Sequence, residues 1–246
     1  MNILIFGGLG RTAAPIVDML NMEKHTITLF DIAENTSFSR NENIKVIRGD
    51  ICDSEAVNNA LYGTDVIIHL AVNILDIGDD ELTFRTNAFG TYNILRGALN
   101  NNVSKILVAS SAPVHTMDEM ANRDDYICSA GEDFAYDLTK NMQKLIAKHF
   151  SRTYSMNCLV LRLGHIVDGR NRTSLSGAPL SELTYCKGGW VCKYDVAKAF
   201  TKAIETDFTG YHLVHIIGSY QAADLFDLSS AKEFIGFTCQ QKFFEY

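Results

Sequence analysis

The sequence is poor in proline and has no excess of positive charge and no long apolar segment. Three prolines among 246 residues, with 47% hydrophobic and 21% charged residues, are typical of an ordered globular chain and argue against disorder. A formal net charge of −7 without a Lys or Arg cluster disfavours nucleic acid as a partner. No apolar run approaches the roughly eighteen residues of a membrane helix, so we expect no membrane partner.

Cysteine motifs are also missing. The six cysteines contain no C-x-x-C pair, so we expect reduced thiols, no bound metal and no nucleophilic cysteine. They are Cys52, Cys128, Cys158, Cys186, Cys192 and Cys239. The chain begins without a basic leader, and we expect no signal peptide and a cytoplasmic protein.

The first thirty-one residues predict a strand, a glycine turn and a helix. The apolar run 3–6 is followed by Gly7, Gly8 and Gly10 and then by an amphipathic segment. Glycine allows a sharp turn at positive φ and a close approach of a pyrophosphate to backbone N–H groups. The N-terminus of the next helix would face those phosphates. This pattern predicts a dinucleotide site.

Asp31 ends the second apolar run, about twenty residues after the last glycine. Its carboxylate would accept hydrogen bonds from the adenosine ribose and repel a 2′-phosphate, which favours NAD over NADP. Ala13 stands at the third glycine of the fingerprint, a substitution that the motif tolerates with looser packing. The alternative is an ordinary tight turn between a strand and a helix.

Strand-like and helix-like segments alternate through residue 163, which predicts right-handed crossovers and a parallel sheet. The fold class is therefore α/β, a doubly wound parallel sheet of the Rossmann type with a small C-terminal substrate-binding portion. We expect strands at 3–6, 26–30, 44–48, 65–71, 105–109, 157–163 and 211–217, and helices at 54–62, 80–101, 135–154, 194–206 and 229–235. Residues 1–163 form the expected cofactor-binding core, and 164–246 the substrate portion of the same compact unit. Between 164 and 193 the periodicity is lost, which predicts substrate-facing loops.

Residues in and after two of the expected strands have competing interpretations. Asp50 and Ile51 follow the strand 44–48 and could flank an adenine. Asp53 or Ser54 could instead simply cap the next helix. His69 lies inside an apolar run, where a hydrogen-bonded core histidine is a better interpretation than a catalyst.

Tyr136 and Lys140 are four residues apart in an expected helix and so share one face. A tyrosine with a pKa near 10 is a poor acid or base at neutral pH, but a neighbouring ammonium stabilises the phenolate. A serine at the end of a neighbouring strand could hydrogen-bond the same substrate oxygen. The alternative is an exposed helix pair worth a few tenths of a kcal/mol.

Several sequence blocks in order resemble the short-chain dehydrogenase/reductase superfamily, specifically its extended branch of NAD-dependent epimerases and dehydratases. They are GGLGRTA (7–13), GDICD (49–53), DVIIHLAV (65–72), NAFGTYNIL (87–95), KILVASSAPVH (105–115), YDLTK (136–140), LRLGHIVDGR (161–170) and YDVAKAF (194–200). The resemblance covers residues 1 to about 217. The short connection 170–195 and the early C-terminus look like uronate-dehydrogenase-like members, which oxidise free sugar acids.

The resemblance implies roles for individual residues. Ser111, Tyr136 and Lys140 form the implied catalytic triad, with Ser111 preferred to Ser110, and Asn87 belongs to the helix behind the site. The implied NAD site comprises Gly7, Gly10, Arg11, Thr12, Asp31, Asp50, Ile51, Leu70, Ala71, Val72, Asn87, Tyr136, Lys140 and Leu163. Hydride would pass between NAD and a carbon bearing a hydroxyl or carbonyl, while Tyr136 moves the matching proton.

Candidate substrate contacts are Asn73, Ser111, His115 and Arg170 or Arg172. An arginine suits a carboxylate, although each could equally be a solvated loop residue. His115 replaces the tyrosine usual in the family, and nothing in the sequence explains that change. The resemblance also implies a homodimer paired through helices 80–101 and 135–154.

The leading interpretation is an NAD-dependent oxidoreductase acting on a small sugar, sugar acid or hydroxy acid. One alternative is an epimerase or dehydratase of a nucleotide sugar, in which oxidation is transient. Another is a non-catalytic NAD-binding sensor. The presence of both Tyr136 and Lys140 argues against the sensor.

Overall fold

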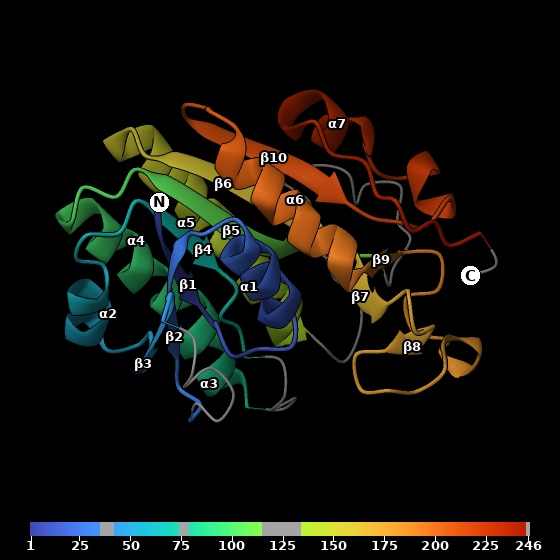
Figure 1. The fold of residues 1–246 in the computed structure, drawn as a ribbon, viewed down its shortest axis with the longest axis horizontal. Helices are drawn as coiled ribbons and strands as arrows, with labels where there is room; N and C mark the ends of the chain where they lie inside the picture. Colours follow the sequence, from blue (N-terminus) through green and yellow to red (C-terminus); the bar gives the residue numbers. More distant parts are fainter. Residues whose placement is uncertain (35–41, 74–78, 115–133, 245–246) are drawn as a thin grey trace.

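The structure is a computed structural model that describes residues 1–34, 42–73, 79–114 and 134–244. Its centre is a seven-stranded sheet in the order β10-β6-β5-β4-β1-β2-β3, with every neighbouring pair parallel (Figure 1). The strands are β1 (Asn2–Phe6), β2 (Thr26–Asp31), β3 (Ile44–Arg48), β4 (Val66–His69), β5 (Lys105–Ser111), β6 (Asn157–Leu163) and β10 (Tyr211–Ile216). The order reverses between β1 and β4, as in a doubly wound Rossmann sheet, which confirms the predicted fold class.

Helices cover both faces of the sheet. They are α1 (Ala13–Met22), α2 (Ser54–Ala60), α3 (Asp80–Phe84), α4 (Gly90–Asn100), α5 (Phe134–Tyr154), α6 (Lys193–Glu205) and α7 (Ser229–Ile235). Helices α1 and α6 pack together on one face, and α2, α4 and α5 pack side by side on the other. Short 3-10 turns lie at Leu180–Glu182 and Gln221–Asp224.

The alternation of side chains along β1 explains why its sequence is apolar throughout. Ile3 and Ile5 join the core beneath α1 and α6, whereas Leu4 and Phe6 join the core beneath α2 and α4. Successive residues of a strand point to opposite faces, and here both faces are covered. The strand is thereby fixed in the middle of the sheet, and the turn that follows it opens at the sheet's carboxyl edge.

Two predicted segments differ from the structure. The expected helix 80–101 is interrupted by a π-helical turn, Arg85–Phe89, whose closing bond runs from Gly90 N to Arg85 O. A π turn adds one residue to the helical repeat and so redirects a side chain. The expected strand 65–71 is shorter, Val66–His69, because the residues after His69 leave the sheet to line a cleft.

The expected loop region 164–193 also contains a small sheet, which the sequence did not predict, although several residues of the region line the cleft as expected. Its strands are β7 (His165–Asp168), β8 (Thr173–Ser174) and β9 (Trp190–Cys192), in the order β8-β7-β9. Trp190 is fully buried in a third core with Val114, Ile217 and Phe243. Strands of two to four residues are too short to show a period, so pattern reasoning could not detect them.

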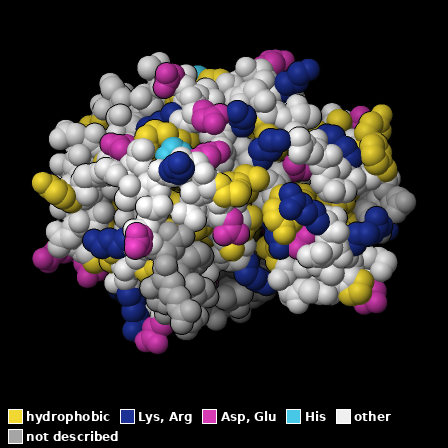
Figure 2. Space-filling model, in the orientation of Figure 1, with side chains coloured by type: hydrophobic (Ala, Val, Ile, Leu, Met, Phe, Trp, Pro, Cys, Tyr) yellow, Lys and Arg dark blue, Asp and Glu magenta, His cyan; other side chains and the backbone are white. Residues whose placement is uncertain are grey.

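The surface visible in Figure 2 has Lys and Arg side chains interspersed with Asp and Glu. Among the described residues, no helix is long and apolar enough to cross a membrane, and no group of His, Cys, Asp or Glu could hold a metal ion. The five cysteines in the described part of the chain are free thiols. Cys128 lies outside the described residues.

Candidate active site

A cleft of about 1100 Å³ lies along the carboxyl ends of the strands. This is the edge at which open α/β sheets bind ligands, at the point where strand order reverses. The structure brings fifteen of the predicted site residues into its lining: Gly7, Gly10, Arg11, Thr12, Asp31, Asp50, Ile51, Leu70, Ala71, Val72, Asn73, Ser111, Tyr136, Lys140 and Leu163. One continuous cavity thus joins the expected nucleotide residues to the expected chemical residues.

The glycine turn between β1 and α1 has the positive φ that the sequence predicted, and it also packs closely against the segment after β4. Gly7 has φ of +78°, and a Cβ there would lie 2.6 Å from Ala71 N. A Cβ on Gly8 would lie 2.7 Å from Leu29 Cβ. Bare backbone of Gly7 therefore lies against the backbone of Ala71 at this end of the cleft. The turn fits a dinucleotide, because only bare backbone leaves room for a pyrophosphate at a helix N-terminus.

Two carboxylates shape the nucleotide end of the cleft. Asp31 accepts hydrogen bonds from Leu9 N at 2.9 Å and from Ala33 N at 3.0 Å. Each carboxylate has about four acceptor positions, so Asp31 can also accept ribose hydroxyls. Asp50 accepts from Cys52 N at 2.8 Å, and Asp53 caps α2 through Glu55 N and Ala56 N. The capping interpretation of Asp53 is confirmed.

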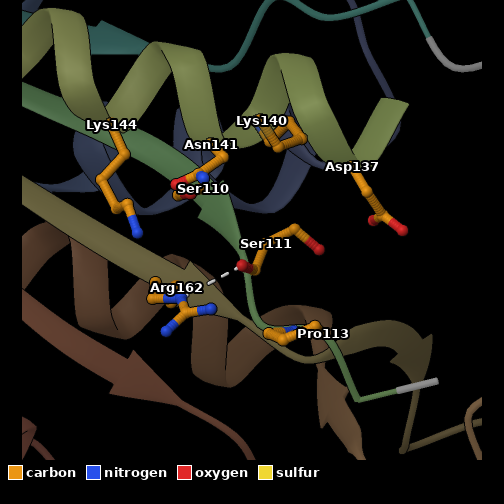
Figure 3. Close-up of a pocket in the computed structure, with 8 residues that line it drawn as sticks. All are labelled: Ser110, Ser111, Pro113, Asp137, Lys140, Asn141, Lys144 and Arg162. Carbon is orange, nitrogen blue, oxygen red and sulfur yellow. Dashed lines mark hydrogen bonds between the residues drawn. The ribbon is translucent and has the colours of Figure 1, made fainter. Parts of the chain in front are cut away.

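The other end of the cleft contains two consecutive serines at the end of β5. Ser110 is buried and Ser111 is half-buried, and both line the cleft. Figure 3 shows Asp137, Lys140, Asn141 and Lys144 extending from α5 beside this strand end, and Arg162 on β6. Arg162 donates through Nε to Ser111 O at 3.2 Å. That bond fixes the backbone on which Ser111 stands.

Lys140 is buried on the inner face of α5. Its ammonium donates to Ala109 O at 2.6 Å and to Gln143 Oε1 at 2.7 Å. Burial lowers the pKa of Lys140 to about 7, since desolvation disfavours the charged form. Tyr136 lies one turn earlier on the same helix and lines the same cleft. The two predicted proton-handling residues thus share the face that borders the cavity.

Asn87 lies behind the cleft and not in its lining. It is fully buried in the π turn, where Oδ1 accepts from Asn73 N at 2.7 Å. Its Nδ2 donates to Asn73 O at 3.2 Å and to Thr139 Oγ1 at 2.9 Å. The side chain therefore connects the segment after β4 to α5 beside Lys140. This placement explains the π turn, which aims Asn87 between two elements.

One predicted substrate residue is not brought into the cleft, and a second lies outside the described residues. Arg170 is exposed and stacks 3.7 Å above the ring of Tyr194, where it borders a separate groove beside α6. His115 lies outside the described residues. Asn73 is at the cleft, but its Nδ2 donates to Thr83 Oγ1 at 3.0 Å.

His69 is a buried core residue, as the preferred interpretation held. Its Nε2 lies 2.8 Å from Thr91 Oγ1, and burial together with the charge of Lys140 lowers its pKa to about 3. It is therefore neutral at physiological pH.

Sequence reasoning missed several residues of the cleft. Arg85 and Thr86 come from the π turn, and His165, Ser174 and Tyr185 come from the small sheet and its connection. No local motif marks them, because their segments meet the cleft only through tertiary packing. Gln143, which contacts Lys140 outside the cleft lining, was also missed. Its position three residues after Lys140 on a helix predicts that the two side chains meet.

Residues 3–177 match the model of the NAD dependent epimerase/dehydratase family. The chain belongs to this family. Its cofactor is accordingly NAD, and the predicted membership in the extended short-chain dehydrogenase/reductases is confirmed.

Curated relatives extend over most of the chain. L-arabinose 1-dehydrogenase (NAD(P)(+)) of Haloferax volcanii is 22% identical over 215 residues, which cover 82% of this chain and 82% of the relative. Uronate dehydrogenase of Pseudomonas syringae pv. tomato is also 22% identical over 215 residues, covering 87% and 73%. Both similar proteins are dehydrogenases of sugars or sugar acids by name.

Solved structures with the same fold include a uronate dehydrogenase and a protein that holds a nucleotide sugar. Uronate dehydrogenase from Agrobacterium tumefaciens, complexed with NAD, has a TM-score of 0.75 at 18% identity, covering 98% of this chain and 85% of its own. MoeE5 in complex with UDP-glucuronic acid and NAD has a TM-score of 0.74 at 15% identity, covering 98% and 94%. At these identities the likeness establishes the fold.

Proposed function

We propose that this protein is an NAD-dependent dehydrogenase that oxidises a hydroxyl-bearing carbon of a small free sugar, sugar acid or hydroxy acid. The observation that supports this most directly is the single cleft in which the glycine turn, Asp31, Ser111, Tyr136 and Lys140 all take part. The sugar and sugar-acid dehydrogenases among its relatives, which match over most of their length, favour the same substrate class. Residues 164–246 would supply the substrate-facing wall of the compact unit.

The proposed role of each cleft residue follows from its position along the cleft. The turn at Gly7 and Gly10 would hold the pyrophosphate, Asp31 the adenosine ribose, Asp50 and Ile51 the adenine side, and Lys140 the nicotinamide ribose. The remaining members of this proposed NAD site are Arg11, Thr12, Leu70, Ala71, Val72, Tyr136 and Leu163, with Asn87 behind it. When bound, NAD supplies the hydride acceptor.

The residues at the inner end of the cleft would carry out proton transfer. Ser111 would hydrogen-bond the substrate hydroxyl, and Tyr136 would take its proton at the phenol oxygen as the carbon is oxidised. The charged Lys140 favours the phenolate form of Tyr136 because opposite charges attract. Asn87, through Thr139 and Asn73, would hold the two sides of this site in register.

The test is the absorbance at 340 nm of purified protein with NAD and a panel of free uronic acids, aldoses and simple hydroxy acids, with NADP in parallel. A continuous rise with NAD and one substrate class is expected. A flat trace with every member of the panel, while NAD binding is demonstrated separately, would contradict the proposal.

The second candidate is an epimerase or dehydratase of a nucleotide sugar. It is favoured by the near-complete mutual coverage with MoeE5, whose structure holds UDP-glucuronic acid. In such an enzyme the reduced cofactor is reoxidised on the protein, so no NADH accumulates. Conversion of a nucleotide sugar without net NADH would support this candidate over the first.

We further propose that the protein forms a homodimer through the outer faces of α4 and α5. Phe89 and Tyr92 stack with ring centroids 6.5 Å apart and are 48% and 45% exposed. Tyr154 and Leu145 of α5 are 42% and 48% exposed. An exposed patch of this composition is typical of an interface. The free thiols of the five cysteines in the described residues favour a cytoplasmic location.

The dimer is tested by the molar mass in solution. Wild-type protein should have twice the mass of the chain, and Tyr92→Glu combined with Leu145→Glu should yield monomer. Tyr62→Glu is the matched control, because Tyr62 is 88% exposed after α2 and lies outside this patch. A monomeric wild type would contradict the proposal.

A further inference from the structure

We infer that Gln143 is a positioning residue that orients the ammonium group of Lys140 and keeps it charged. The inference deepens the proposed function, on which it rests, because Lys140 would act through Tyr136. Gln143 is fully buried on α5, three residues after Lys140. Its Oε1 accepts from Lys140 Nζ at 2.7 Å, and its Nε2 lies 3.0 Å from Thr91 Oγ1. A fully buried carboxamide is thus joined directly to the expected catalytic lysine.

The hydrogens around Thr91 determine which way the carboxamide of Gln143 faces. Thr91 Oγ1 donates its one hydrogen to Asn87 O at 2.6 Å. The hydroxyl must therefore accept from its other two neighbours, His69 Nε2 at 2.8 Å and Gln143 Nε2. Two donors that converge on one oxygen explain why the nitrogens of His69 and Gln143 lie only 3.2 Å apart. The NH2 group of Gln143 faces Thr91, and its carbonyl oxygen faces Lys140.

This arrangement leaves His69 with its hydrogen on Nε2. Its Nδ1 is then an acceptor, and it is buried with no hydrogen-bond partner within the described residues. Because His69 is neutral, with its pKa lowered to about 3, it places no second positive charge beside Lys140. Every hydrogen in this network has an acceptor only if the carbonyl oxygen of Gln143, and not its NH2 group, faces Lys140.

Lys140 has three N–H donors, of which two are held by Ala109 O and Gln143 Oε1. The third remains for the cleft that Lys140 lines. Acceptors of this kind favour the ammonium form and oppose the desolvation that lowers its pKa to about 7. The charged or titratable groups nearby are His69 on β4, Tyr136, Asp137 and Lys144 on α5, and Arg162 on β6.

The direct test is the pKa of Lys140 measured by NMR titration of the lysine side-chain signals, assigned by comparison with Lys140→Met. Replacing Gln143 with Met removes the acceptor and keeps the approximate volume. The Lys140 pKa should then fall by about one unit, the effect of losing one hydrogen bond to a charged group. Gln143→Glu should raise it, since a carboxylate favours the ammonium. Ser151→Ala, buried on the same helix two turns further, is the matched control and should leave it unchanged.

The pH profile of turnover provides a second readout. If the ammonium is the active form, activity is lost as the pH rises through the Lys140 pKa. The alkaline limb of kcat should move to lower pH in Gln143→Met and to higher pH in Gln143→Glu, with KM for the sugar unchanged. A merely structural role would lower folded yield without moving the limb.

The two proposals fail separately. An unchanged Lys140 pKa in both Gln143 variants would overturn the role of Gln143, whatever the substrate. Absence of turnover by the wild type on the whole panel would instead overturn the dehydrogenase, while the titration still decides the role of Gln143. If Gln143→Met does not fold, the upward shift in Gln143→Glu remains the deciding measurement.

Discussion

The two ends of the cleft are built in different ways. At the nucleotide end the contacts involve the backbone: the turn at Gly7 approaches Ala71, and the Asp31 carboxylate accepts hydrogen bonds from the backbone N–H groups of Leu9 and Ala33. At the chemical end the groups are side chains from different elements. There Lys140 depends on Gln143, which depends on Thr91.

This difference has a physical reason. A phosphate is recognised by many N–H groups at close range, which a short glycine turn supplies by itself. A proton-transfer group must instead be held in direction and in charge state, and this requires buried partners from several elements. The phosphate-binding turn is therefore local in sequence, and the chemical end is not.

The largest expected effect is at the chemical end. Tyr136→Phe removes the phenol proton carrier while leaving the glycine turn untouched, so kcat should fall by about 10²–10⁴-fold. The affinity for NAD, measured by calorimetry, should remain close to that of the wild type. Turnover at the wild-type rate would remove Tyr136 from the mechanism.

The next largest effect is expected at Gly7, where a substitution tests the close approach to Ala71 separately from the strain of a positive φ. Gly7→Ala introduces both a positive-φ residue and a Cβ only 2.6 Å from Ala71 N. It should cost about 3 kcal/mol of unfolding free energy and weaken NAD binding by at least about tenfold.

Gly63→Ala is the matched control for this variant. Gly63 has φ of +73° with nothing within 4 Å of an added Cβ. Urea unfolding should show a loss of only about 1 kcal/mol, with NAD affinity unchanged. Equal losses in both variants would show that the approach to Ala71 is unimportant.

The smallest expected effect concerns cofactor preference. Asp31→Asn keeps an acceptor for Leu9 N or Ala33 N but removes the negative charge that would repel a 2′-phosphate. The ratio of NADP to NAD affinity should rise about tenfold, a change of roughly 1.4 kcal/mol. A wild-type preference for NADP would show that the interpretation of Asp31 is wrong.

The same contrast explains what the sequence could predict. The glycine turn, Asp31 and the sheet follow from local spacing and apolar periodicity, and the structure has them in the predicted places. Tyr136 and Lys140 were found because a helix places residues four apart on one face. These features need no knowledge of what packs against them.

The rest depended on tertiary contacts. The π turn at Arg85–Phe89 exists because Asn87 bonds both Asn73 and Thr139, which are distant in sequence. The strands β7 to β9 are two to four residues long and are held by the core around Trp190. Arg170 was favoured for its charge, but its placement over Tyr194 is set by packing. Such features have no period or spacing to detect.

The central claim is that the cleft transfers hydride from a free sugar to NAD and releases NADH. The most direct measurement is incubation with NAD and a sugar or sugar acid whose carbon-bound hydrogens are all deuterium, followed by mass analysis of the cofactor. The account predicts that NADH containing one deuterium accumulates with the wild type and fails to accumulate with Tyr136→Phe. Unreduced NAD with every free sugar, together with conversion of a nucleotide sugar, would contradict it.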